Sequence, residues 1–287
     1  MRPENRELVG IGDVILAAHP GSGASWVGTL LTHLGIFYLS GEDELLADAQ
    51  SQRAGGLAED RERALPGAEA TGRPNVGVQA QLEHLPTLRD RDRDHATWRE
   101  PVRVIKTNLS SLSWTPPCRV LLLVRDGRDA VLSLYHHRVN FSDLDVPLLD
   151  FLTGNDGAWL PPPMSWAMAS MSWIGSTPKD QIHLLKFETC KADPLEEFRS
   201  MLTFMEIERT DAEIETAIAA SSYNAMRRQE SAAMEEHGAE IGSGRIMRKG
   251  QVGEWREVYT EPMLATFKGM PRRALKQLGY PVDEIPG

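Results

Sequence analysis

The sequence contains only two cysteines, Cys118 and Cys190, among its 287 residues. Two cysteines cannot build a disulfide framework or a cysteine metal cluster, so we expect two reduced thiols in a cytoplasmic protein, with no metal. The chain also lacks an apolar run of the roughly 18 residues that a membrane helix needs. Residues 1–10 are too polar and charged for a signal peptide. We therefore expect a soluble protein without a membrane anchor.

The sequence also has fewer basic than acidic residues. The 31 lysines and arginines are outnumbered by 41 aspartates and glutamates, which leaves a net charge of −10. This balance argues against nucleic acid or an anionic membrane as the main partner. An anionic ligand must instead be held by a local cationic site. The length suits one large α/β domain, and with no clear linker we predict a single domain over residues 1–287.

Short apolar runs alternate with amphipathic stretches along most of the chain. Buried strands are predicted at residues 14–18, 102–106, 120–124 and 182–187. Helices are predicted at residues 26–37, 129–137, 194–204, 212–220 and 262–278, the last with a bend at Pro271. This alternation predicts an α/β fold with a central parallel sheet flanked by helices. Ligands of such sheets bind beyond the carboxyl ends of the strands.

Residues 40–100 differ in character from the rest of the chain. They contain several glycines and prolines, and arginine alternates with aspartate at 89–94. We interpret this region as a loop-rich insertion with one or two short helices, and the charge run as a solvated face. Such an insertion could act as a lid over a site.

The first of three phosphate-type segments is Ala-His-Pro-Gly-Ser-Gly-Ala-Ser-Trp at residues 18–26, directly after a predicted strand. Gly21 and Gly23 let backbone N–H groups approach an anion, and the helix that follows adds partial positive charge. Ser22 and Ser25 can donate hydroxyl hydrogen bonds. The alternative is a tight strand-to-helix turn without a ligand.

This loop departs from the Walker pattern of ATP and GTP sites. Gly23 and Gly28 have the Walker glycine spacing, but Thr29 follows Gly28 directly with no lysine between them. An ordinary nucleoside triphosphate site is therefore not expected.

The other two segments supply cationic side chains. Arg125 follows a predicted strand, and Ser133 comes eight residues later, about two helical turns on. A guanidinium can bind a phosphate bidentately, and the serine hydroxyl adds a donor. Arg248 and Lys249 stand beside Gly250, where side-chain charge and free backbone amides can converge. The alternatives are a surface ion-pair network and a basic turn.

The three segments, in this order, resemble those of the cytosolic-type sulfotransferases that use 3′-phosphoadenosine 5′-phosphosulfate (PAPS). That family carries Tyr-Pro-Lys-Ser-Gly-Thr-Thr-Trp, then Arg with Ser eight residues later, then Arg-Lys-Gly followed by Gly-Asp-Trp. The resemblance runs from about residue 13 to 260 and implies a P-loop nucleotide-kinase-like sulfotransferase fold. It also implies a small-molecule sulfotransferase of bacterial type, with PAPS as co-substrate and adenosine 3′,5′-bisphosphate (PAP) as product. The acceptor would be a hydroxyl of a small molecule such as a secondary metabolite.

The resemblance further implies roles for individual residues. The backbone amides of Ser22, Gly23, Ala24 and Ser25, with the Ser25 hydroxyl, would hold the 5′-phosphate. The 3′-phosphate would be held by Arg125, Ser133, Arg248, Lys249 and Gly250. Trp26 and Tyr223 would sandwich the adenine, with Phe187 beside it. The alternative for Trp26 and Phe187 is a place in the hydrophobic core.

Two departures from the family pattern fall on catalytic positions. Gly21 stands where the family has a lysine that contacts the leaving phosphate, and Asn108 stands where it has a histidine base. Lys106 is retained and would serve the sulfuryl group, because cations stabilise the negative charge of the transition state. Asn108 can orient a hydroxyl by hydrogen bonding but cannot remove its proton at neutral pH.

Three explanations of the missing base are open. Another histidine can act instead, and we favour His19 because it adjoins the donor loop, with His136 and His137 as alternatives. An acceptor that is acidic or that assists its own deprotonation needs no base. Finally, the protein can be a catalytically weak PAPS- or PAP-binding protein on the same scaffold. A P-loop nucleotide kinase is a further alternative, which the absent Walker lysine disfavours.

A stretch rich in methionine and tryptophan at residues 159–173 has two readings. Methionine adapts to irregular apolar ligands, so the stretch could line an acceptor pocket. It could equally form a core helix. Its large residues are Trp159, Met164, Trp166, Met168, Met171 and Trp173, around the turn at 161–163.

Overall fold

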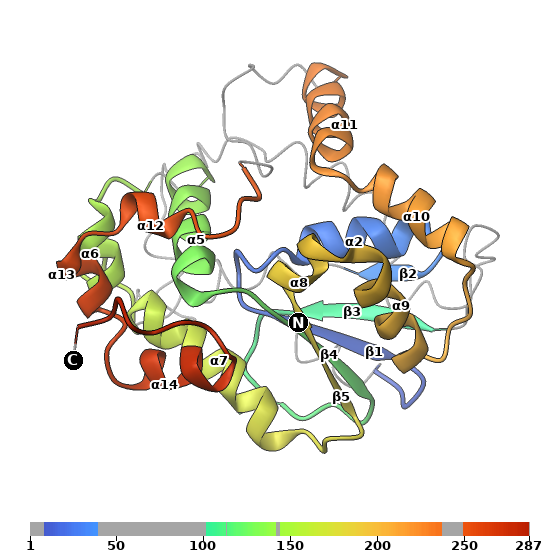
Figure 1. The fold of residues 1–287 in the computed structure, drawn as a ribbon, viewed down its shortest axis with the longest axis horizontal. Helices are drawn as coiled ribbons and strands as arrows, with labels where there is room; N and C mark the ends of the chain where they lie inside the picture. Colours follow the sequence, from blue (N-terminus) through green and yellow to red (C-terminus); the bar gives the residue numbers. More distant parts are fainter. Residues whose placement is uncertain (1–8, 40–101, 113, 142–143, 237–248, 287) are drawn as a thin grey trace, which may run out of the picture.

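The computed structural model of the chain describes residues 9–39, 102–112, 114–141, 144–236 and 249–286 (Figure 1). Its five strands form one sheet in the order β2-β3-β1-β4-β5, and all neighbouring strands are parallel. The strands are β1 (Val14–Ala18), β2 (Phe37–Leu39), β3 (Arg103–Thr107), β4 (Arg119–Val124) and β5 (Ile182–Lys186). The predicted central parallel sheet is confirmed. The predicted insertion at 40–100 lies outside the described residues.

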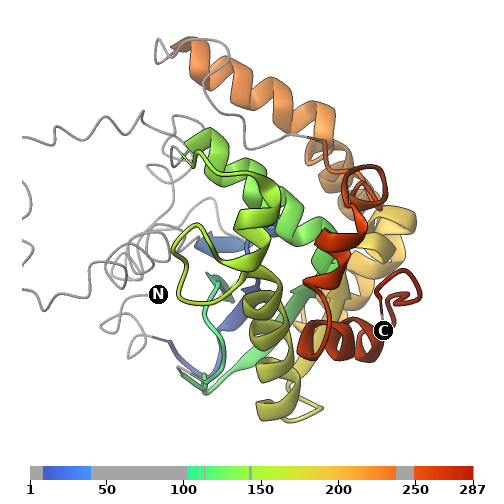
Figure 2. The same ribbon diagram turned by 90° about the vertical axis from the view of Figure 1, so that its left-hand side faces the viewer.

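Helices cover both faces of this sheet (Figures 1 and 2). They are α2 (Ala24–His33), α5 (Gly127–Phe141), α6 (Leu148–Thr153), α7 (Pro162–Ser176), α8 (Phe187–Ala192), α9 (Pro194–Phe204), α10 (Asp211–Ala220), α11 (Tyr223–Glu236), α12 (Trp255–Val258), α13 (Glu261–Ala265) and α14 (Met270–Gln277).

Alternate residues of each central strand belong to two separate cores. Ile15 and Ala17 of β1 pack with α5, α6, α7 and α14, whereas Val14 and Leu16 pack with α2, α9 and α10. Every residue of β1 is buried because both faces of the sheet are covered, which explains why the strand is apolar throughout. The result is a three-layer α/β/α arrangement.

Two of the predicted helices are wrong in extent. The helix predicted at 26–37 ends early, because the N–H groups of Gly35 and Ile36 fold back onto the carbonyls of Thr32 and Leu31, a Schellman-type end. The next residues then form strand β2. The helix predicted at 262–278 is two helices, α13 and α14. The break falls at Gly269, whose φ of 70° does not fit a helix, and not at Pro271.

Smaller differences concern element ends. Phe187 was predicted as the last residue of a strand, but it begins α8, and α5 extends further at both ends than the predicted 129–137. Among the described residues, no helix has the length and apolar character to cross a membrane.

Candidate functional site

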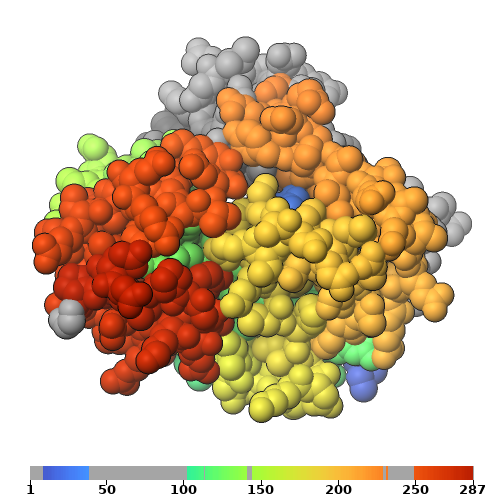
Figure 3. Space-filling view, viewed as in Figure 1, coloured from blue at the N-terminus to red at the C-terminus, as the bar shows by residue number. Residues whose placement is uncertain are grey.

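The residues predicted to bind a ligand follow the carboxyl ends of the strands, at one edge of the sheet. β1 leads into the first loop, β3 into Asn108, β4 into Arg125 and β5 into Phe187. The parallel register sets Ala17 beside Thr107 and Ala18 beside Leu123, so these ends are level. In the space-filling view, blue atoms of the N-terminal segment are visible between the yellow and orange atoms of the later helices (Figure 3).

The first loop joins β1 to α2 through two glycines. Gly21 and Gly23 have φ angles of 85° and 100°, and Gly23 is the N-cap of α2. The first N–H groups of a helix have no partner within the helix, so those at the start of α2 can bind an anion. The N–H of Ser22, also predicted to bind the phosphate, instead donates to the carbonyl of His19 at 3.1 Å. The Ser22 side chain is 1% exposed. Its hydroxyl has no hydrogen-bond partner among the described residues, which is unusual for a buried polar atom.

Gly21 is pressed against helix α5. A Cβ atom at Gly21 would overlap the carbonyl oxygen of Ala130 and lie 3.2 Å from the backbone nitrogen of Leu134. Both obstacles are backbone atoms, which cannot swing aside. The loop therefore has no room for a side chain at this position. This is the position where the family that the sequence resembles has a lysine.

We expect the variant Gly21→Ala to lower the free energy of unfolding by at least about 2 kcal/mol. A left-handed backbone costs an ordinary residue about 1–2 kcal/mol, and overpacking adds about 1–3 kcal/mol. Chemical denaturation measures the change. Gly12→Ala is the matched control, because nothing lies within 4 Å of a Cβ at Gly12. Equal stabilities of the two variants would contradict the observed packing.

Arg125 connects the first and third segments. Its side chain is 5% exposed. Nη1 donates to the carbonyl of Gly21 at 3.0 Å, and Nη2 donates to the carbonyl of Gln251 at 2.7 Å. The guanidinium also lies 4.6 Å from the centre of the Phe187 ring. One buried cation thus touches three segments that are far apart in the sequence.

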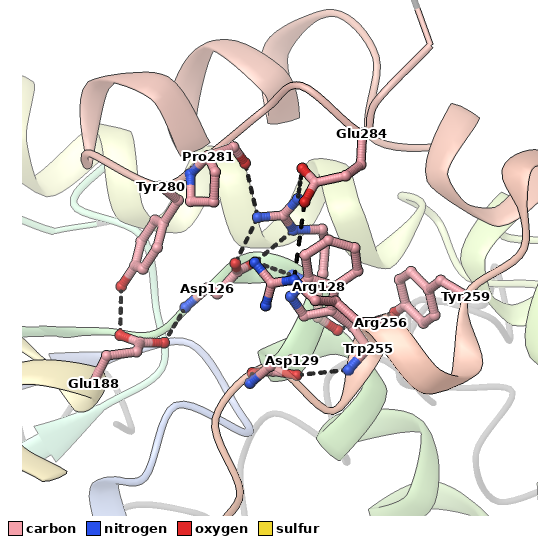
Figure 4. A network of polar contacts seen from close by, with 11 residues as sticks. Asp126, Arg128, Asp129, Glu188, Trp255, Arg256, Tyr259, Tyr280, Pro281 and Glu284 are labelled. Atoms are coloured by element: carbon pink, nitrogen blue, oxygen red, sulfur yellow. Dashed lines mark hydrogen bonds and ion pairs between the residues drawn. The ribbon is translucent and has the colours of Figure 1, made fainter. Parts of the chain in front are cut away.

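Asp129 fixes the third segment onto α5 (Figure 4). Its carboxylate accepts hydrogen bonds from the backbone nitrogens of Gly253 at 2.6 Å and Trp255 at 3.0 Å. Burial raises the pKa of Asp129, while the Arg125 charge and these two hydrogen bonds oppose that rise. Sequence reasoning assigned this carboxylate no part in the site, and the Arg-x-x-x-Asp spacing from Arg125 was the only available signal.

A second buried pair lies directly behind Asp129. Arg128 is fully buried and binds Asp126 through two side-chain hydrogen bonds of 2.9 and 2.6 Å. Its guanidinium lies 3.7 Å from the centre of the Trp255 ring and donates to the carbonyl of Pro281 at 2.8 Å. The C-terminal segment is thereby tied to the strand end that carries the site (Figure 4).

Glu188 extends this network to α8, the helix that follows β5. It accepts a hydrogen bond from the backbone nitrogen of Asp126 at 2.9 Å and another from the Tyr280 hydroxyl at 2.9 Å. Burial is the main cause of the raised pKa of Glu188. The carboxylates of this edge are therefore all engaged in holding backbone and side chains in place.

The predicted adenine contacts are only partly brought together. The rings of Trp26 and Phe187 meet edge to face with centres 5.6 Å apart, and Phe187 is buried beneath Gly23. Tyr223 opens α11 and lies beside the third segment, since its ring is 3.9 Å from a Cβ placed at Gly250. Trp26 is half-buried, and the ammonium of Lys191 lies 5.1 Å from the centre of its ring.

The remaining predicted phosphate contacts differ in placement. Lys249 is half-exposed and forms an ion pair with Glu254 at 2.9 Å. Ser133 lies half-buried on α5. Arg248 lies outside the described residues.

The predicted catalytic side chains lie at the ends of two adjacent strands, within β3 or directly after β3 and β1. Lys106 in β3 is 4% exposed, and burial lowers its pKa to about 7. Two residues on, the buried side-chain oxygen of Asn108 has no hydrogen-bond partner among the described residues. His19 follows β1, and its Nδ1 is 2.8 Å from the carbonyl of Pro20. Burial is the main reason that the pKa of His19 falls to about 4.

Most of the tryptophan-rich stretch lies in α7, and two of its large side chains belong to the core. Trp166 and Trp173 are 0% and 2% exposed. The indole N–H of Trp173 donates to the carbonyl of Leu109 at 3.0 Å, which supports the segment after β3. Trp159 precedes the helix and is 81% exposed. The core-helix interpretation therefore holds for Trp166 and Trp173. Across the described ranges, no three histidine, cysteine, aspartate or glutamate residues form a metal-binding group.

The chain is similar in sequence to proteins of a known family. The family model described as "Sulfotransferase domain" matches residues 12–279. Sulfotransferase 1E1 of Rattus norvegicus is 21% identical over 279 residues, covering 92% of this chain and 83% of the relative. Sulfotransferase 1B1 of Mus musculus is 24% identical over 191 residues, covering 60% of this chain and 61% of the relative. The alignment with the mouse protein thus spans less than two thirds of that relative.

Solved structures share the arrangement of elements. Mouse sulfotransferase SULT7A1 complexed with PAP aligns with a TM-score of 0.61 at 18% identity, covering 96% of this chain and 88% of that one. Retinol dehydratase in a complex with retinol and PAP aligns with a TM-score of 0.61 at 18% identity, covering 96% and 86%. At this identity the likeness shows a common fold.

Proposed function

Since this chain belongs to the sulfotransferase family, we propose that it transfers a sulfuryl group from PAPS to a hydroxyl of a small-molecule acceptor. The single observation that carries the donor assignment is the buried Arg125 guanidinium, which joins the first loop to the third segment. Two of the solved structures that share the fold contain PAP, and one of them also contains retinol. These likenesses support the proposal for donor and acceptor class.

The residues at the sheet edge fit a nucleotide with phosphates at both ends. The start of α2 offers backbone N–H groups, and the buried Ser22 hydroxyl there lacks a hydrogen-bond partner within the described segments, as expected of a donor reserved for a phosphate. We propose that Ser25 adds a second hydroxyl. On the opposite side, Arg125 and Ser133 would hold the 3′-phosphate, with Lys249, Gly250 and Arg248 from the third segment.

The acceptor side would be served by the residues after β3. PAPS supplies the sulfuryl group when bound. Lys106 would place positive charge beside that group, where negative charge grows in the transition state. Asn108 would accept a hydrogen bond from the acceptor hydroxyl, because its buried side-chain oxygen is unsatisfied among the described residues. Because no side chain fits at Gly21, Lys106 would be the one lysine at the sulfuryl group among the described residues. It would therefore stabilise more of the transition-state charge than it would beside a second lysine.

Thermal unfolding with PAP, AMP and ATP in parallel tests the donor site. A ligand at 100 times its dissociation constant adds about 2.7 kcal/mol to the stability. We expect PAP to stabilise the protein and the other two nucleotides to have little effect. Stabilisation by ATP alone would instead favour a nucleotide kinase.

The variant Arg125→Lys should weaken PAP binding about 10- to 100-fold, because hydrogen bonds to charged groups contribute about 1.5–3 kcal/mol and a lysine cannot bind bidentately. Isothermal titration calorimetry measures the loss. Arg199→Lys is the matched control, since Arg199 makes ion pairs on the surface with Glu196 and Asp211. Equal PAP affinity of both variants would remove Arg125 from the proposed site.

A second candidate function is PAP or PAPS binding with little turnover. Gly21 and Asn108 favour it, because the first brings no cation to the leaving group and the second cannot act as a base. Product formation distinguishes the two. Sulfated product from any acceptor establishes transfer, whereas PAP binding without product supports the binding protein.

A further inference from the structure

Sulfuryl transfer to a hydroxyl leaves one proton to be removed, and this inference rests on the proposed function. Asn108 cannot take that proton. The nearby carboxylates of Asp126, Asp129 and Glu188 are engaged with Arg128, with the third segment and with Tyr280. Apart from Lys106, which is assigned to the sulfuryl group, the described groups near the edge that can accept a proton at neutral pH are histidines.

One of these histidines lies on the helix face that borders the donor loop. Gly21 packs against the backbone of Ala130 and Leu134 in α5. His137 is seven residues after Ala130 and three after Leu134, so it lies on the same face of the helix. Helical side chains lean toward the preceding turn, which here is the turn that contacts the loop. His137 is half-buried, so part of it remains exposed.

Two cationic side chains lie near the His137 ring. Lys106 of β3 and Arg138 of α5 act on the ring, and burial together with these two cations lowers the pKa of His137 to about 4. Arg138 is itself ion-paired with Asp156 at 3.4 Å and lies over the Phe151 ring. His137 is therefore neutral at pH 7, as a base must be, and it lies near the lysine proposed to serve the sulfuryl group.

The other two histidines fit less well. The charge that acts on His19 is that of Arg138, and His19 is only 6% exposed. His136 lies edge-on to the Tyr135 ring with centres 5.5 Å apart. It is six residues after Ala130, which turns it away from the face that borders Gly21.

We propose that His137 is the general base of this enzyme, with Asn108 holding the acceptor hydroxyl. A ring nitrogen of His137 takes the hydroxyl proton while the acceptor oxygen forms its bond to sulfur. The bond between sulfur and the donor phosphate oxygen breaks, and its electron pair stays on that phosphate as PAP. The proton on His137 then passes to solvent, which returns the ring to its neutral form.

The test compares His137→Ala, His19→Ala and the control His136→Ala. Turnover is measured with PAPS and a panel of phenol, 4-nitrophenol, and primary and secondary alcohols, and PAP affinity is measured by calorimetry. We expect His137→Ala to bind PAP normally and to lose about 10²-fold in kcat with phenol. The loss should be smaller with 4-nitrophenol, which is far more acidic than phenol and ionises near neutral pH without help. Added imidazole should restore turnover in His137→Ala and should leave the turnover of His136→Ala unchanged.

Several outcomes would overturn the assignment. Normal turnover in His137→Ala does so, as does an equal loss on both phenols without rescue by imidazole, or a loss confined to His19→Ala. A wild-type protein that binds PAP but sulfates no member of the panel overturns the base role together with transfer. Failure of the wild-type protein to bind PAP removes the donor site itself, which separates that result from a wrong choice of histidine.

Discussion

Replacing Lys106 with methionine is expected to lower kcat by about 10²- to 10³-fold, the usual effect of removing one group that stabilises transition-state charge. The effect should lie at the upper end of this range because the packing around Gly21 excludes a second cation from the loop. Methionine keeps the length of the side chain without its charge, so packing around a residue that is 4% exposed should survive. Steady-state turnover with PAPS measures the change.

The pH dependence of turnover provides a second view of Lys106. Its pKa of about 7 means that the free protein loses this positive charge as the pH rises through about 7. Because the charged form of Lys106 is the active one, kcat/KM for the donor should fall above about pH 7 and be constant below it, down to about pH 4, where His137 becomes protonated. In Lys106→Met this descending limb should disappear.

The matched control for Lys106→Met is Lys179→Met, which removes a charge from an exposed turn. It should keep both the rate and the pH profile of the wild-type protein. If Lys106→Met retains the rate, or if the descending limb persists in it, Lys106 does not serve the sulfuryl group.

Replacing Arg128 with methionine is expected to destabilise the protein by about 3–5 kcal/mol, because it leaves the buried carboxylate of Asp126 without its partner. The variant also loses the hydrogen bond to Pro281 and the stacking on Trp255. For a chain of this size, a loss of 1 kcal/mol lowers the melting temperature by about 2–4 °C. The melting temperature should therefore fall by on the order of 10 °C.

Two comparisons separate this effect from a general loss of charge. Arg199→Met breaks surface ion pairs and should leave the melting temperature unchanged. The double variant Arg128→Met with Asp126→Asn should recover part of the loss, because it no longer buries an unpaired charge. No recovery in the double variant would show that stacking and packing, and not the ion pair, account for the stability.

The network around Arg128 also explains how the third segment reaches the site. Asp129, one residue on, holds the backbone of Gly253 and Trp255, so two hydrogen bonds fix the third segment to α5. A variant that loosens this connection should therefore weaken nucleotide binding as well as folding. PAP titrations of Arg128→Met at a temperature where it stays folded would reveal that coupling.

The sequence by itself determined the strands of the sheet except β2, and the ordered set of ligand segments. The runs at 14–18 and 120–124 are apolar on both faces, which indicates a covered parallel strand, and the glycine loop at 18–26 begins where such a strand ends. The match of these segments to one family depends on order and spacing, which are properties of the chain. Element ends were less certain, because the stop at Gly35 depends on backbone hydrogen bonds that residue patterns do not show.

Only the tertiary structure decided which side chains meet. Arg125 and Gln251 are 126 positions apart, and no local pattern indicates that one donates to the other. The closed space at Gly21 depends on helix α5, more than 100 residues later, so the loop alone could not reveal it. The sequence already offered His137 as an alternative base to His19, but only its nearness to Lys106 on another element places it before His19. The burial and the electrostatic environment of a site depend on residues that are distant in the sequence and meet only in the folded protein. The strands and loops that carry the site depend mainly on the local sequence.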